Sequence, residues 1–108
     1  MKIELDHLLV PARDRFAAAQ LIAGLLGVPC SAPGAIAPFS PVYVNDGLTL
    51  DFDPWSDPLP RLHRCFRVDP ADFDAILARI RAAGIAYRST LRGPDDQQVN
   101  PAFGGSIV

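Results

Sequence analysis

Residues 61–68, RLHRCFRV, carry one of the two histidines of this chain, His63, on a pattern typical of a β-strand. The other histidine, His7, lies in a similar pattern near the start, IELDHLLV at residues 3–10. In that segment a two-residue alternation groups His7 with three aliphatic side chains, those of Ile3, Leu5 and Leu9. We therefore expect the imidazole of His7 to point inward and the functional site to lie between the two strands.

A helix signal follows each of these strands. After the first, Asp14 is a suitable N-cap, and apolar residues recur at helical spacing until Gly27, a residue that commonly ends helices. After the second, Asp69 and Pro70 supply a cap and a proline at the first helical position, and Gly84 closes the pattern. The sequence thus predicts a helix directly after each strand.

Strand, helix and helix-ending glycine recur as an internal repeat. His63 follows His7 by 56 residues, and Gly84 follows Gly27 by 57 residues. Two copies favour a pseudo-symmetric domain, because a solenoid needs about three or more copies to bury its faces. We therefore expect a single domain over residues 1–108, built from a first module at about 1–54, a proline-rich connector at 54–60 and a second module at about 61–108.

A β-hairpin is predicted in the first module. Two short strands, at residues 41–45 and 48–53, flank Asp46-Gly47, and a tight turn of this kind needs residues that tolerate positive φ. Asp51 lies on the polar face of the second arm. The hairpin therefore presents a carboxylate on a strand.

The second module does not repeat this hairpin in full. Residues 104–108 resemble its first arm, and no second arm follows in the sequence. Unpaired neighbouring strands would present backbone groups that each cost about 1 kcal/mol or more if buried. Either another chain supplies the missing strand, or the sheet edge stays open.

Composition and charge limit the classes of partner. The chain has 108 residues, 49% hydrophobic and 20% charged, which is enough for one domain with a core. Its net charge is −2, and it has no run of Lys or Arg that would indicate binding to nucleic acid or to a membrane surface. No apolar stretch approaches the ~18 residues that span a bilayer. We expect a cytoplasmic protein with a small-molecule partner, in which Cys30 and Cys65 are reduced thiols.

Several segments together resemble the vicinal oxygen chelate superfamily, which includes glyoxalase I, bleomycin-resistance proteins, fosfomycin-resistance enzymes and extradiol dioxygenases. They are DHLLV, LGVP and NDGLTLDF in the first module, and HRCFRV, AAGIAY and NPAFGGSIV in the second. The resemblance covers essentially the whole chain. It implies an α+β fold of two tandem βαβββ modules that form an open barrel-like cup, with the second module incomplete at the C-terminus, and it implies a homodimer.

The resemblance also implies a divalent metal ion in the cup, to which two adjacent substrate oxygens bind. His7 and His63 match the ligands on the first strand of each module, and Asp51 matches a carboxylate of glyoxalase-like members. A final glutamate ligand has no counterpart, so the ligand set is incomplete in this chain. Two imidazoles with a carboxylate suit Fe(II), Mn(II), Ni(II) or Zn(II), any of which can act as a Lewis acid. Asp51 would be either a ligand or the catalytic base.

Five further residues are candidates for binding the substrate. The alternation of the second strand pattern places Cys65 and Arg67 on the face of His63. The aromatic candidates for lining a pocket are Tyr43, Trp55 and Phe103. Simpler roles exist for each type: aromatic residues of small domains are more often core or interface, and Cys65 can be an apolar filler. A histidine on an apolar strand face is likewise more often a hydrogen-bonded core residue than a metal ligand.

Two hypotheses about function follow. In the first, the protein is a metal-dependent enzyme of the glyoxalase or dioxygenase type, acting on a small substrate with vicinal oxygens by Lewis-acid catalysis. In the second, it is a metal-free binding protein of the bleomycin-resistance type, and the acidic balance of the chain is compatible with a cationic ligand. Metal content separates the two.

Overall fold

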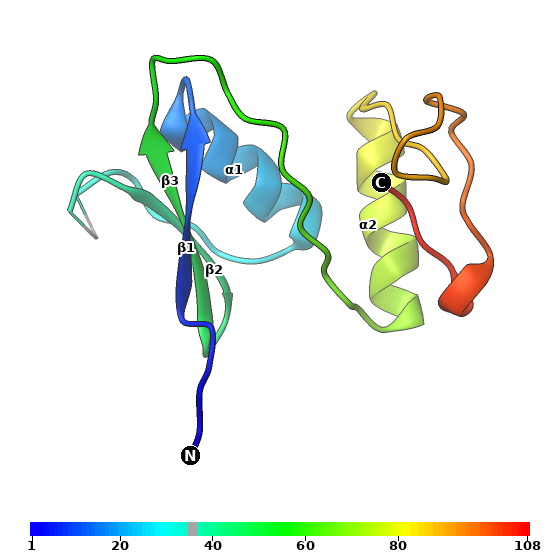
Figure 1. The fold of residues 1–108 in the computed structure, drawn as a ribbon, viewed down its shortest axis with the longest axis horizontal. Coiled ribbons are helices and arrows are strands. Elements are labelled where there is room, and N and C mark those ends of the chain that lie inside the picture. The colour runs from blue at the N-terminus through cyan, green and yellow to red at the C-terminus, as the bar shows by residue number, and fades with distance from the viewer. Residues whose placement is uncertain (35–36) are drawn as a thin grey trace. The chain divides into compact units, whose positions relative to one another are not determined.

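The computed structural model describes residues 1–34 and 37–108, and in this part the chain is α+β (Figure 1). Its elements follow in the order β1 (His7–Ala12), α1 (Arg15–Leu26), β2 (Ser40–Asn45), β3 (Leu48–Pro54), α2 (Pro70–Ala82) and the 3-10 helix η1 (Ala102–Gly104). The chain divides into two units, Met1–Arg67 and Val68–Val108. The sheet and α1 belong to the first unit, and α2 and η1 belong to the second.

The sheet of the first unit has the strand order β1-β3-β2. β2 and β3 are the antiparallel arms of the hairpin predicted around Asp46-Gly47. In its turn the N–H of Gly47 donates a hydrogen bond to Oδ1 of Asn45 at 2.8 Å. β1 lies parallel to β3 on the other side. The hairpin is therefore confirmed, but its turn does not use the expected positive φ, which neither Asp46 nor Gly47 adopts. The first strand is added to the second arm of this hairpin.

Helix α1 covers one face of this sheet, and the core of the first unit lies between them. Its buried residues come from both layers and are Ala12, Ala19, Ala23, Val42, Leu50 and Phe52. Leu8 and Val10 extend the core from β1, whereas His7 and Leu9 occupy the alternate positions of that strand and are exposed. The expectation of an inward-pointing His7 is therefore wrong, because α1 packs against the opposite face of β1.

Both ends of α1 confirm their sequence signals. Oδ1 of Asp14 accepts a hydrogen bond from the N–H of Ala17 at 3.1 Å, as an N-cap does. Gly27 adopts a φ of 73°, and its N–H bonds to the carbonyl of Ala23. A residue with a Cβ is strained in this left-handed conformation, which explains why glycine ends the helix here.

Residues 61–69 form neither helix nor strand, so the strand predicted at 61–68 is not present. Its counterpart in the first module, β1, is held by a ladder of backbone hydrogen bonds to β3. The described structure offers residues 61–68 no partner of that kind. A periodic side-chain pattern alone does not stabilise an extended segment, because the strand conformation depends on pairing with a neighbour.

The second unit is built around α2. Pro70 is its first residue, and Gly84 follows its last turn with a φ of 69°, both as the sequence predicts. Leu77 and Tyr87 are its buried apolar residues among those described. The predicted helix is therefore confirmed.

The strand predicted at residues 104–108 is not formed as a continuous element. Part of this stretch lies in η1, Ser106 makes an isolated bridge with Asn100, and Val108 exchanges two backbone hydrogen bonds with Arg88. Gly104 and Gly105 have φ values of 86° and 118°, which depart from the extended backbone of a strand. Among the described residues, no helix is long and apolar enough to cross a membrane.

Candidate functional site

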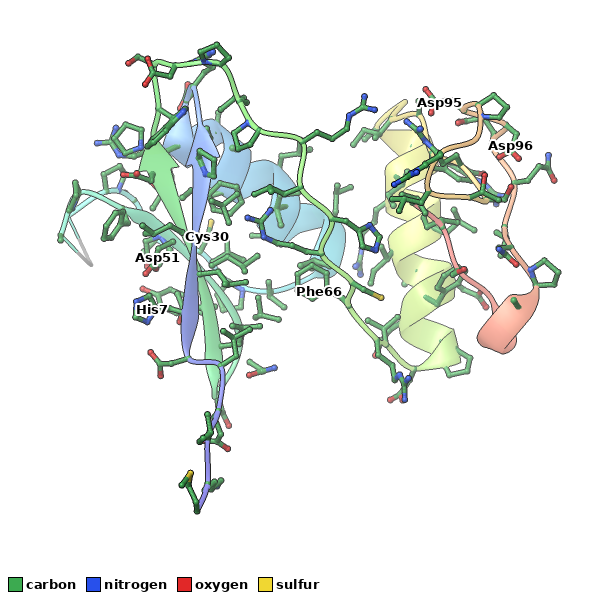
Figure 2. All side chains as sticks on the ribbon, viewed as in Figure 1. His7, Cys30, Asp51, Phe66, Asp95 and Asp96 are labelled. Carbon is green, nitrogen blue, oxygen red and sulfur yellow. The ribbon has the colours of Figure 1, made fainter. Side chains whose placement is uncertain are left out.

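The face of the sheet opposite α1 carries polar side chains in register. His7 pairs with Thr49 across β1 and β3, and Tyr43 of β2 pairs with Thr49 from the other side. Paired residues project to the same face of a sheet, so these three side chains form a row. Asp51 lies two residues beyond Thr49 on β3 and therefore faces the same way. Figure 2 shows His7 and Asp51 on the same side of the sheet.

Asp51 is the most unusual residue of this face. It is only 5% exposed, and its Oδ1 atom is buried without a hydrogen-bond partner in the described part of the chain. A buried polar atom without a partner is costly, so nearly all such atoms in folded proteins are satisfied by protein, water or an ion. The carboxylate of Asp51 is therefore suited to receive a cation or a donor from a ligand.

His7 is the second polar group with chemistry to offer. Its Nδ1 lies 2.9 Å from Oδ2 of Asp6, and this hydrogen bond raises the pKa of His7 above 6.5. Desolvation opposes this increase, and the negative charges of Asp6 and Asp51 add smaller increases of their own. The charge of Asp51 therefore acts on the same ring, from a position on the same face of the sheet. Nε2 of His7 is the ring nitrogen that remains for a ligand.

His63 is not part of this pair. It is exposed and lies in the segment without regular secondary structure. Across residues 1–34 and 37–108, no group of three or more His, Cys, Asp or Glu side chains is arranged to hold a metal ion. The structure thus brings His7 and Asp51 to one face, but it does not assemble the three predicted ligands.

The chain is similar to two solved structures of proteins named oxidases. No protein-family model matches the sequence, and no curated protein is significantly similar to it. Among solved structures, oxidase ChaP-H1 is 34% identical with a TM-score of 0.84, and the match covers 98% of this chain and 88% of that chain. Oxidase ChaP-H2 is also 34% identical, with a TM-score of 0.83, over 93% of this chain and 77% of the other.

The chain belongs to the family of these two oxidases. The chain shares the fold of these two proteins, both of which are named oxidases. A more distant likeness, to the integron cassette protein HFX_CASS4 from the mobile metagenome of the Halifax Harbour sewage outfall, has 14% identity and a TM-score of 0.57. That match covers 78% of this chain and 73% of the other and concerns the fold alone.

The residues predicted to bind substrate in this ChaP-H-like chain have different surroundings. Tyr43 is half-buried on the face of Asp51, and its hydroxyl lies 3.0 Å from Oγ of Ser31. Trp55, Cys65 and Arg67 are exposed. The prediction that Cys65 is an inward-facing filler is wrong, because no strand forms around it. The side chain of Phe103 lies outside the described structure.

Sequence reasoning missed two residues of the site. Thr49 lies between His7 and Tyr43, and its position two residues before Asp51 in a predicted strand was a usable signal. Asp6 contacts the ring of His7, although alternation assigns adjacent strand residues to opposite faces. Asp6 precedes the first residue of β1, so that rule does not hold there.

Proposed function

We propose that the chain is a metal-dependent oxidative enzyme of the vicinal oxygen chelate type, acting on a small substrate with two adjacent oxygens. The observation that carries this proposal is the buried Oδ1 of Asp51 on the sheet face of His7, which has no hydrogen-bond partner among the described residues. Membership of the ChaP-H oxidase family supports oxidation over the other reactions of that superfamily.

The two residues fit a divalent metal in part. Nε2 of His7 and Oδ1 of Asp51 are a nitrogen and an oxygen donor, the mixture that Fe(II), Mn(II), Ni(II) and Zn(II) accept. His63 is proposed as the third ligand, which requires residues 61–68 to form a strand at the cup. Two histidines and one carboxylate are a typical ligand set of non-haem Fe(II) oxygenases. Such an ion, when bound, would draw charge from the substrate oxygens as a Lewis acid.

The protein's own groups have separate tasks in this proposal. Asp51 contributes a carboxylate with little access to water, which strengthens its interaction with a cation. His7 must be neutral to act as a ligand, so its raised pKa makes a proton a stronger competitor than at an ordinary histidine. Thr49 and Tyr43 line the same face as polar neighbours that can orient a substrate.

The assembly of the site is also a proposal. Two βαβββ modules would form the cup, and a homodimer would complete it. In that arrangement the apolar residues now exposed beside His7 would lie at an interface. The partner of the assembled protein would be a small molecule, for which Arg67, Cys65 and Trp55 remain candidate contacts.

Metal content tests the proposal. Protein purified without chelator is subjected to elemental analysis and then titrated with Fe(II), Mn(II), Ni(II) and Zn(II). We expect uptake of about one ion per chain, and loss of uptake in a His7→Ala/His63→Ala variant. Absence of stoichiometric uptake, or equal uptake by the variant, would contradict the proposal. Absence of uptake would instead favour the metal-free binding protein of the bleomycin-resistance type.

A further inference from the structure

We infer that Asp6 is a positioning residue that holds the ring of His7 with Nε2 directed away for a ligand. This inference rests on the proposed function for its purpose, but the contact itself is a feature of the chain. Asp6 was not among the residues expected at the site.

The position of Asp6 is fixed through its backbone. Its carbonyl accepts a hydrogen bond from the N–H of Thr49 at 3.0 Å, which ties the residue before β1 to β3. Thr49 is also the residue opposite His7 in the register. The backbones of Asp6 and His7 are therefore both held next to Thr49 of β3. Only the side chain of Asp6 must then adopt one conformation for its carboxylate to contact the ring.

The contact selects one form of the imidazole. Oδ2 of Asp6 is 2.9 Å from Nδ1 of His7, and a carboxylate accepts hydrogen bonds, so Nδ1 carries the proton and donates it. The neutral ring then has its lone pair on Nε2. Histidines that bind metals usually donate their other ring N–H to a carboxylate or carbonyl, and losing that partner weakens metal affinity by about 10–100-fold.

Stability does not explain the contact. The side chains of His7 and Asp6 are 59% and 87% exposed. Exposed pairs of this kind contribute little to folding, because water and salt screen them. Orientation of the ring is the role that a solvent-exposed carboxylate at this distance can still perform. Asp51 also influences the pKa of His7 through its charge, but among the described contacts its carboxylate makes no hydrogen bond to the ring.

The test compares wild type with three variants at a pH where His7 is neutral. Asp6→Ala removes the acceptor, and Asp6→Asn keeps a neutral acceptor of the same shape. Glu4→Gln is the matched control, because Glu4 is an exposed carboxylate two residues earlier whose ion pair is with Lys2. Two readouts are used: the affinity for Zn(II) by calorimetry, and the tautomer of His7 in the metal-free protein by nitrogen-15 NMR.

We expect Asp6→Ala to weaken Zn(II) binding by about 10–100-fold with unchanged stoichiometry, and Asp6→Asn to fall between it and wild type. The Nδ1–H tautomer should dominate in wild type and in Glu4→Gln, and should lose population in Asp6→Ala. Unchanged affinity and an unchanged tautomer in Asp6→Ala would overturn the inference. If wild type binds no metal, the proposed function fails, and the NMR readout still decides whether Asp6 sets the ring.

Discussion

Two buried oxygens at the sheet, Oγ of Ser40 and Oδ1 of Asp51, have no hydrogen-bond partner among the described residues, but they lie on opposite faces. Ser40 pairs with Phe52, a core residue, so its hydroxyl faces α1. Asp51 faces away from α1, beside His7. A buried oxygen without a partner therefore has a different consequence on each face. In the core it only lowers stability, whereas on the open face it can bind a ligand or a metal ion.

Replacing Ser40 with alanine should stabilise the protein. The hydroxyl is fully buried and has no partner in the part of the chain that the structure describes, so its removal recovers a desolvation penalty and loses no described hydrogen bond. We expect the free energy of unfolding to rise by about 1 kcal/mol in chemical denaturation. A decrease of comparable size would show that this hydroxyl has a partner in solution.

The pKa of His7 offers a test by pH titration. The hydrogen bond with Asp6 raises this pKa above 6.5, so protonation is more favourable in the folded chain than in the unfolded one. The small stabilisation that results is fully present below pH 6.5 and is lost as the pH rises through the folded pKa. NMR titration of His7 should show the raised value in wild type and a lower one in Asp6→Ala. Identical titration curves would contradict the effect of Asp6.

At the scale of elements, α1 carries two glycines with opposite requirements. Gly24 lies inside the helix with open space around the site of a Cβ, whereas Gly27 is the left-handed C-cap. Gly24→Ala should therefore raise the free energy of unfolding by up to about 1 kcal/mol, and Gly27→Ala should lower it by about 1 kcal/mol. Thermal or denaturant unfolding of both variants checks this pair. Shifts of the same sign would contradict the assigned helix end.

The elements that sequence could predict are those with local signals. Asp14 and Gly27 mark the ends of α1, and Asp46-Gly47 marks the hairpin turn, because caps and turns are decided by a few adjacent residues. The repeat also predicted α2. These signals need no knowledge of distant partners.

The elements and site features that sequence could not predict depend on distant contacts. In DHLLV, apolar residues occupy both alternating positions, so alternation could not decide whether Leu8 or Leu9 faces the core until the position of α1 was known. Residues 61–68 have a strand pattern without a pairing partner in the described structure. Asp51 was predicted as a site residue, but its burial and the lack of a hydrogen-bond partner for Oδ1 among the described residues follow from the packed sheet.

At the scale of the whole molecule, the open face and edge of the first unit predict self-association. Leu9 lies on β1, an edge strand of the described sheet, and is 51% exposed. Ile3 and Leu5, in the segment before β1, are 84% and 61% exposed. Exposed apolar side chains on and beside an edge strand favour an interface. We expect a homodimer in sedimentation experiments, with Leu5→Lys shifting the protein toward monomer. A monomer that is independent of concentration would contradict this expectation.

The central claim is that Asp51 and His7 together hold a divalent ion, and the affinity for Mn(II) tests it most directly. Free Mn(II) is counted by EPR in titrations of wild type, Asp51→Asn and Asp53→Asn, the last being a matched change on the same strand and face. We predict that Asp51→Asn loses about 100-fold or more in affinity, while Asp53→Asn stays within about threefold of wild type. Equal affinities in wild type and Asp51→Asn would contradict the account.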